Sequence, residues 1–195
     1  MEIERYEIRI AGFGGQGVVT IGRILGVAFT VFSGINSVNT QSYGPESRGG
    51  ACRSEVVLSH AEINYPYVRR ADTLIALSAV ALDTYLKDVK KGGLLIIDPD
   101  AVRVGKNAAD QRVVPIPAAA IAHDSGGVKY QNIVVLGALQ CLIAEYIEKT
   151  ALKKAIKATV PPETFDTNVE AFEKGRAHAK AFLNSKPEFR ALMDA

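Results

Sequence analysis

Apolar and polar positions along the chain predict strands that alternate with helices. Apolar residues recur at every second position over 6–10, which is typical of a strand with one buried face. A glycine-rich stretch follows, and the apolar spacing over 18–28 then suits a buried helix. A second strand is expected over 36–40. The chain therefore opens with a strand, a glycine turn and a helix.

An antiparallel hairpin is predicted after the second strand. Its two strands, over 51–59 and 62–65, flank a short turn at His60-Ala61. Residues 40–50, which come before the hairpin, are rich in turn formers and are interpreted as an extended loop. The hairpin would add an antiparallel element to a sheet that is otherwise mostly parallel.

The middle of the chain contains continuous apolar runs, which are typical of strands buried on both faces. Such strands are predicted over 73–77 and 94–98, and a shorter one over 112–116 is followed by an Ala-rich helix. A helix that ends at Gly92-Gly93 is expected between the first two strands, with one apolar stripe formed by Leu82, Tyr85, Leu86 and Val89. This alternation predicts an α/β fold of Rossmann-like, three-layer type.

Three further helices are predicted toward the end of the chain. The stretch 133–143 is apolar almost all round, which indicates a helix in the core or at a subunit contact. A lysine-bearing surface helix over 148–157 is followed by Pro161-Pro162. The last helix has one apolar stripe, formed by Phe165, Val169, Phe172, Ala179 and Phe182. No linker divides the chain, so residues 1–195 are expected to form a single domain, on which the helices from about residue 150 pack.

Composition and charge narrow the classes of function. The net charge of +2 is too small to indicate nucleic-acid binding. No apolar run is long enough to span a bilayer, and the first residues do not resemble a secretory signal, so a cytoplasmic location is expected. Cys52 and Cys141, the only cysteines, do not form a close pair. An iron–sulfur cluster or zinc ribbon held by this chain alone is therefore excluded.

The glycine turn is the first candidate site. Gly12, Gly14 and Gly17 fit the pattern Gly-x-Gly-x-x-Gly between a strand and a helix, where the helix start offers N–H groups to a phosphate or carboxylate. The alternative is a turn that only lets the helix pack closely. Gly15 and Gln16 depart from the usual pattern, and Gln16 could hydrogen-bond a ligand or tie down a neighbouring loop. The second strand ends without the carboxylate that a standard dinucleotide site needs, which disfavours NAD.

The loop over 41–50 is the second candidate site. It combines the hydroxyl groups of Tyr43 and Ser47 with the guanidinium of Arg48, and we expect it at the same sheet edge as the glycine turn. Together the two loops would form a concave anion-binding surface. The other interpretation is an interface loop whose Arg48 pairs with a carboxylate of a partner subunit, and both interpretations can hold at once.

The two loops together resemble the gamma subunit of 2-oxoacid:ferredoxin oxidoreductases. The motifs are Gly-Phe-Gly-Gly-Gln-Gly-Val-Val-Thr over 12–20 and Gln-Ser-Tyr-Gly-Pro-Glu-Ser-Arg-Gly-Gly over 41–50. The resemblance continues through 54–59, 71–78 and 132–137. The motif at 41–50 is most similar to the 2-oxoglutarate branch, although pyruvate, ketoisovalerate and indolepyruvate enzymes share most of it.

The resemblance implies an accessory subunit of an enzyme that converts 2-oxoglutarate, coenzyme A and oxidised ferredoxin to succinyl-CoA, carbon dioxide and reduced ferredoxin. The chain has neither the Gly-Asp-Gly of thiamine-binding chains nor cluster cysteines. Thiamine diphosphate, Mg and the iron–sulfur clusters are therefore expected in partner subunits. Those partners would be thiamine-binding alpha and beta subunits, a ferredoxin-like delta subunit and ferredoxin.

The resemblance also implies a shared coenzyme A site, with no catalytic residue and no metal ligand in this chain. The expected contacts with coenzyme A come from Gly12, Gly14, Gly15, Gln16, Gly17, Ser47 and Arg48. The expected interface residues are Tyr43, Glu46 and Arg48, and the isolated chain is compatible with a homodimer. The alternatives are a purely structural subunit and a stand-alone NAD(P)-binding enzyme.

Overall fold

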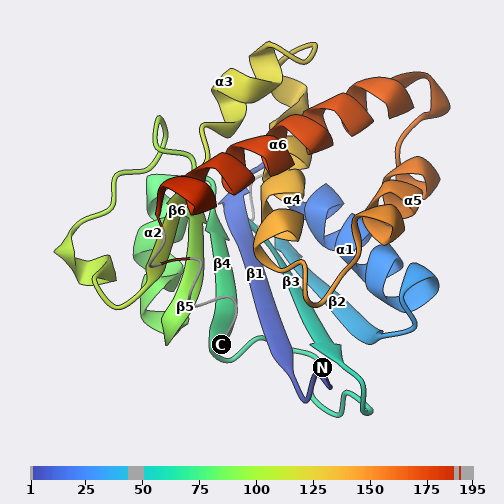
Figure 1. Ribbon diagram of the computed structural model, residues 1–195. Coiled ribbons are helices and arrows are strands. Elements are labelled where there is room, and N and C mark those ends of the chain that lie inside the picture. The colour runs from blue at the N-terminus through green and yellow to red at the C-terminus, as the bar shows by residue number, and fades with distance from the viewer. Residues whose placement is uncertain (1, 44–50, 187–188, 190–195) are drawn as a thin grey trace.

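The computed structural model of the chain describes residues 2–43, 51–186 and 189 (Figure 1). Its centre is a six-stranded sheet in the order β2-β3-β1-β4-β5-β6. The strands are β1 (Tyr6–Phe13), β2 (Asn36–Tyr43), β3 (Ala51–Ser59), β4 (Ala71–Ala76), β5 (Val89–Ile97) and β6 (Arg112–Pro115). The α-helices are α1 (Val18–Phe32), α2 (Ala79–Tyr85), α3 (Ala118–His123), α4 (Gln131–Leu142), α5 (Lys149–Thr159) and α6 (Phe165–Ser185). Short 3-10 helices are η1 (Leu86–Asp88), η2 (Lys106–Ala108), η3 (Val128–Tyr130) and η4 (Pro162–Thr164).

The sheet is mostly parallel and carries helices on both faces, which confirms the predicted α/β class. β1, β4, β5 and β6 form a parallel ladder, while β3 runs antiparallel to both β1 and β2. α1 packs on β1, β2 and β3, and α4 joins the same hydrophobic core. α2 packs against the other face, over β4 and β5 (Figure 1).

The antiparallel part of the sheet differs from the predicted hairpin. Residues 62–65 are not a strand, and the strand that pairs with β3 in a hairpin is β2. The guanidinium of Arg5 donates to the carbonyl oxygens of Tyr65 and Tyr67, each at 2.9 Å. A side chain therefore engages the backbone groups that a neighbouring strand would otherwise pair. β2 is also longer than expected, because residues 40–43 belong to the strand and not to the loop.

Gly92-Gly93 lies inside β5, so the prediction that it ends a helix is wrong. The helical segment stops earlier, with η1, and Val89 already begins the strand. The ladder pairs Ala71 with Val89 and Thr73 with Leu94, which leaves extra residues in β5 and makes a bulge. The two glycines serve this bulge, because a Cβ atom at the second one would lie 2.8 Å from the Lys90 carbonyl oxygen.

The C-terminal helices pack on the helices nearer the sheet, with α5 against α1 and α6 across α4. The backbones of α4 and α6 are in direct contact where each helix has a glycine. A Cβ atom on Gly137 would collide with the Phe172 carbonyl, and one on Gly175 would collide with the Val134 carbonyl. α4 is buried on almost every side by this arrangement, which explains its uniformly apolar sequence. None of the helices among the described residues is long and apolar enough to cross a membrane.

Candidate functional site

The glycine turn lies at a topological switch point of the sheet. β1 and β4 are parallel neighbours, but the helix that follows β1 packs on one face and the helix that follows β4 packs on the other. In open α/β sheets a crevice forms where consecutive connections diverge in this way, at the carboxyl ends of the strands. The turn between β1 and α1 lies at the carboxyl end of β1, and Leu77 and Ser78 lie at the carboxyl end of β4.

The turn leaves the start of α1 open. Gly17 is the N-cap residue and has a left-handed backbone, with φ 73° and ψ 20°. No described side chain caps this end of the helix. The first backbone N–H groups of α1 therefore lack the usual intrahelical acceptors and face the edge of the sheet. Gly14 and Gly15 are exposed beside them, so a ligand can approach the backbone closely.

Gln16 connects the turn to the residue that follows β4, the parallel neighbour of β1. Its Oε1 accepts a hydrogen bond from the Phe13 N–H (2.6 Å), and its Nε2 donates to the Leu77 carbonyl oxygen (2.9 Å). Gly12 makes room for this bridge, since a Cβ atom there would collide with the Oε1 of Gln16. Of the two roles left open for Gln16, the structure shows the tie between loops, because both polar atoms of the side chain have partners within the chain.

Asn132, at the start of α4, is a second amide beside the turn, and the sequence analysis did not identify it. Its side chain lies against Gly17, because a Cβ atom on that glycine would overlap the Asn132 amide. Asn132 is 7% exposed, and its Oδ1 is buried with no donor from the described residues. The available signal was a polar residue placed directly before a long apolar helix.

The described residues on either side of the second candidate loop, Tyr43 and Ala51, lie at the same edge. Glu46, Ser47 and Arg48 lie outside the described residues, and only the backbone of Tyr43 is described. Tyr43 pairs with Cys52, which in turn pairs with Gly12 across β3 and β1. Both ends of the loop therefore begin next to the residues that open the glycine turn.

Arg53 is a described cation close to this edge that the sequence analysis also missed. It pairs with Ala11 in the ladder, and its side chain is 40% exposed. Its Nη1 lies 3.5 Å from the Tyr85 hydroxyl, and this interaction raises the pKa of Arg53. Its Nε also lies 3.9 Å from the Glu55 carboxylate, so this guanidinium already has an ionic partner within the chain.

The described residues contain no cluster of side chains that could hold a metal ion. Cys52 is buried, and burial raises the pKa of its thiol, so it does not supply a reactive thiolate. Asp98, at the carboxyl end of β5, accepts the backbone N–H groups of Asp100 (3.1 Å) and Ala119 (2.9 Å). This carboxylate is therefore engaged in holding a turn and the start of α3. The open helix start at this edge fits the binding of an anionic group.

Comparisons with known proteins agree with this arrangement. Residues 7–178 match the family described as pyruvate ferredoxin/flavodoxin oxidoreductase. The 2-oxoglutarate synthase subunit KorC of Methanothermobacter thermautotrophicus is 46% identical over 178 residues, which are 88% of this chain and 94% of that protein. The keto/oxoacid ferredoxin oxidoreductase gamma subunit of Geobacter sulfurreducens PCA matches with a TM-score of 0.77 at 36% identity, over 90% of this chain and 99% of that one. The 2-oxoglutarate:ferredoxin oxidoreductase of Magnetococcus marinus, solved with 2-oxoglutarate, coenzyme A and succinyl-CoA bound, matches with a TM-score of 0.83 at 26% identity, over 92% of this chain and 32% of that one.

Proposed function

Because this chain belongs to the pyruvate ferredoxin/flavodoxin oxidoreductase family, we propose that it works in a 2-oxoglutarate:ferredoxin oxidoreductase. The chain is an accessory subunit of a 2-oxoacid:ferredoxin oxidoreductase, as its relatives are. The proposed reaction consumes 2-oxoglutarate, coenzyme A and oxidised ferredoxin, and it yields succinyl-CoA, carbon dioxide and reduced ferredoxin. The 46% identity with a 2-oxoglutarate synthase subunit over nearly its whole length supports this choice of oxoacid.

The catalytic cofactors are proposed to belong to partner subunits. Thiamine-binding alpha and beta subunits would carry thiamine diphosphate and Mg, and a ferredoxin-like delta subunit would carry iron–sulfur clusters and pass electrons to ferredoxin. The chain has only two cysteines, Cys52 and Cys141, whereas an iron–sulfur cluster is usually held by four. The chain's own contribution is to bind and orient a substrate at a shared site.

We assign coenzyme A to the glycine-turn edge. The observation that carries this assignment is the uncapped start of α1 at the switch point between β1 and β4. The pyrophosphate of coenzyme A would accept hydrogen bonds from the first N–H groups of α1, beside Gly14, Gly15 and Gly17. Gly12 and Gln16 would hold the turn in shape, while Ser47 and Arg48 would approach from the neighbouring loop.

The β2 edge of the sheet is proposed as a contact with another chain. Its eight residues, Asn36–Tyr43, include no charged residue and no proline, although monomeric proteins usually protect long edge strands with such residues. A strand of a partner subunit, or of a second copy of the isolated chain, would pair along it. Tyr43, Glu46 and Arg48 would then belong to this interface at its carboxyl end.

Replacing Arg48 by Ala in the reconstituted complex tests the coenzyme A assignment. Loss of a charged contact with a phosphate is expected to raise the KM for coenzyme A about tenfold, with the KM for 2-oxoglutarate unchanged. Arg69→Ala is the matched control, because Arg69 is exposed at the opposite, amino end of β1, where the Glu7 carboxylate accepts its backbone N–H. An unchanged KM for coenzyme A in Arg48→Ala would reject the assignment, and preferred turnover of pyruvate or another 2-oxoacid would reject the choice of 2-oxoglutarate.

A further inference from the structure

Two carboxamide side chains flank the glycine turn, and only one of them is engaged within the chain. Gln16 donates one hydrogen bond and accepts another. Asn132 is more deeply buried, and its Oδ1 has no donor from the described residues. A buried acceptor without a donor costs about 1–3 kcal/mol, so such a group is retained for a reason other than stability.

Asn132 lies where two helices begin. It is in the first turn of α4 and contacts Gly17, the N-cap residue of α1. Neither of these helix starts is capped by a described side chain. Both helix dipoles therefore place partial positive charge around this amide, which favours an anionic group nearby. The atom of Asn132 without a partner is its oxygen, which can accept a hydrogen bond from a donor next to that anion.

We propose that Asn132 is a binding residue of the glycine-turn site, whose oxygen accepts a hydrogen bond from an N–H or O–H group of the bound molecule. This inference rests on the proposed coenzyme A site. Coenzyme A combines the required groups, because its pyrophosphate is anionic and its pantetheine arm carries amide N–H and hydroxyl donors. Gln16, which the sequence suggested as a ligand-binding amide, then has the positioning role, and Asn132 has the binding role.

The oxygen of Asn132 is buried and its amide group lies against Gly17, so binding is expected to move residues 14–17. Gly15 and Gly17 both have positive φ angles, 97° and 73°, and no side chain restricts their rotation. Hydrogen exchange of the backbone amides in this turn should therefore change when coenzyme A binds, and it should not change in a variant that has lost the Asn132 contact.

The direct test is Asn132→Leu in the assembled complex, measured by calorimetric titration with coenzyme A and with 3′-phospho-ADP, which lacks the pantetheine arm. Loss of one hydrogen bond is expected to weaken the binding of coenzyme A about tenfold. The affinity for 3′-phospho-ADP is expected to stay the same if the donor lies on the pantetheine arm. An equal loss for both ligands would support the inference with the donor on the nucleotide half.

Gln140→Leu is the matched control on the same helix. Gln140 is 2% exposed, and its amide is fully engaged, with Nε2 donating to the Ile147 carbonyl (3.0 Å) and Oε1 accepting from Arg176. The control should lower the melting temperature and leave the affinity for coenzyme A unchanged. Asn132→Leu should show the opposite pattern, with weaker binding and a melting temperature equal to or above that of the wild type, because it removes an unpaired buried acceptor.

Two outcomes separate this inference from the proposed function. If Arg48→Ala weakens coenzyme A binding while Asn132→Leu binds as tightly as the wild type, only the role of Asn132 is overturned. If neither variant changes the affinity, the assignment of coenzyme A to this chain is overturned as well. A fall in melting temperature without loss of affinity would make Asn132 a structural residue and would also reject the inference.

Discussion

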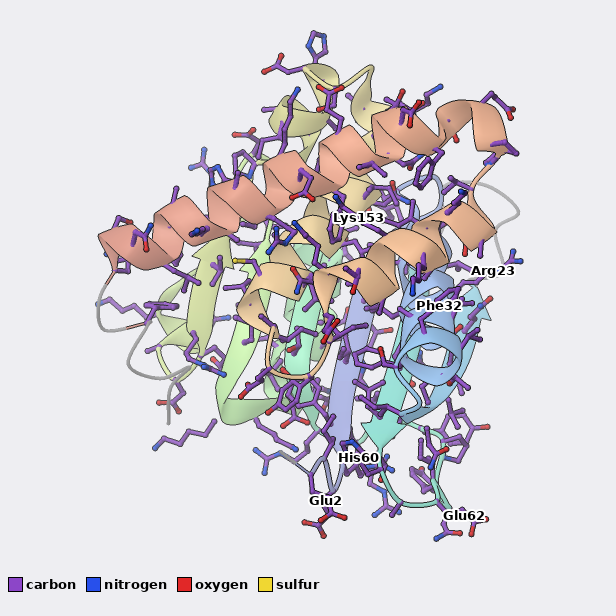
Figure 2. The ribbon with its side chains drawn as sticks, turned by 45° about the vertical axis from the view of Figure 1, so that its right-hand side comes forward. Glu2, Arg23, Phe32, His60, Glu62 and Lys153 are labelled. Carbon is purple, nitrogen blue, oxygen red and sulfur yellow. The ribbon has the colours of Figure 1, made fainter. Side chains whose placement is uncertain are left out.

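The two ends of the sheet are held together by different chemistry. At the amino end of β1, charged side chains fix the irregular segment 60–70, which lies beside the N-terminus (Figure 2). Glu7 accepts the backbone N–H groups of Arg69 and Arg70, each at 2.9 Å, while Arg9 pairs with Glu55 (2.8 Å) and donates to the Val68 carbonyl (3.0 Å). At the carboxyl end, glycines and neutral amides shape the turn.

This difference indicates that the amino end of the sheet contributes to stability, whereas the carboxyl end is available for binding. Charges at the amino end are paired within the chain, so they rigidify a segment and have little capacity for a ligand. At the carboxyl end, the start of α1 and the oxygen of Asn132 lack partners among the described residues. We therefore expect changes at the amino end to act on folding, and changes at the carboxyl end to act on binding as well.

The largest effect is expected from Arg9→Met at the amino end. The side chains of Arg9 and Glu55 are 6% and 4% exposed, so removal of the guanidinium takes the nearest cation away from a buried carboxylate. The free energy of unfolding should fall by about 3–5 kcal/mol, measured by urea denaturation. Arg69→Met is the control, since this guanidinium stacks on the Tyr65 ring and should cost no more than about 1 kcal/mol.

If Arg9→Met does not accumulate in folded form, Arg9→Lys provides the same measurement. Lysine keeps the positive charge but lacks the planar guanidinium, so the free energy of unfolding should fall by less than in Arg9→Met. Equal stability of the Arg9 and Arg69 variants would remove the contrast between the two ends.

A smaller loss of stability, combined with a loss of binding, is expected from Gly12→Ala at the carboxyl end. The new Cβ atom would displace the Gln16 amide from its bridge and lie 3.0 Å from the Leu77 Cβ. Overpacking of this kind costs about 1–3 kcal/mol, and the KM for coenzyme A should rise because the turn loses its shape.

Gly26→Ala is the control for the Gly12 variant. Its Cβ atom would meet only Asn39 and Ser37, at 3.8 Å, and alanine favours the helical conformation, so α1 should become slightly more stable. A Gly12→Ala protein with unchanged stability and unchanged KM would show that the Gln16 bridge does not shape the site.

The smallest effect is expected from Glu173→Gln on the surface, where charges are neither buried nor near the site. Burial favours a higher pKa for the Glu173 carboxyl group, but hydrogen bonds from Lys153 and Arg176 outweigh it and lower the pKa from its ordinary value of 4.5. A lowered pKa in the folded state contributes stability above the unfolded-state value, and this contribution is lost as the pH falls through the folded-state value. Glu173→Gln should therefore lower the stability at pH 7 by less than about 1 kcal/mol, since the pair is partly exposed.

Melting temperatures of wild type and Glu173→Gln, compared between pH 7 and pH 3, check this prediction. The difference should be visible at pH 7 and shrink at pH 3. A difference that grows toward acid would mean that the carboxyl group is not stabilised by its cationic neighbours.

Local patterns predicted much of the framework. The alternation over 6–10 and the apolar spacing over 18–28 correspond to β1 and α1, and the continuous runs correspond to β4 and β5. These elements follow from residues close in sequence. The segment 62–65 was predicted wrongly, because its conformation depends on Arg5, about sixty residues away in the chain.

The candidate site was only partly predictable for the same reason. The glycine pattern identified the turn. The hydrogen bond of Gln16 to the Leu77 carbonyl, however, depends on the pairing of β1 with β4, which the local sequence does not show. Asn132 is visible in the sequence as a polar residue before an apolar run, but it reaches the turn only through the packing of α4, so the sequence could not assign it to the site. Gly92-Gly93 looked like a helix end because a bulge and a helix end both use glycine at positive φ.

The bare crossing of α4 and α6 has a consequence for engineering the protein. Gly137 lies five residues after Asn132, about 7.5 Å along the helix axis. A side chain at Gly175 would collide with the Val134 carbonyl and increase the distance between α4 and α6. The resulting shift of α4 would change the position of Asn132 relative to Gly17. Affinity at the sheet edge can therefore be tuned by remote substitutions in the C-terminal helix, without altering a single atom that faces the ligand.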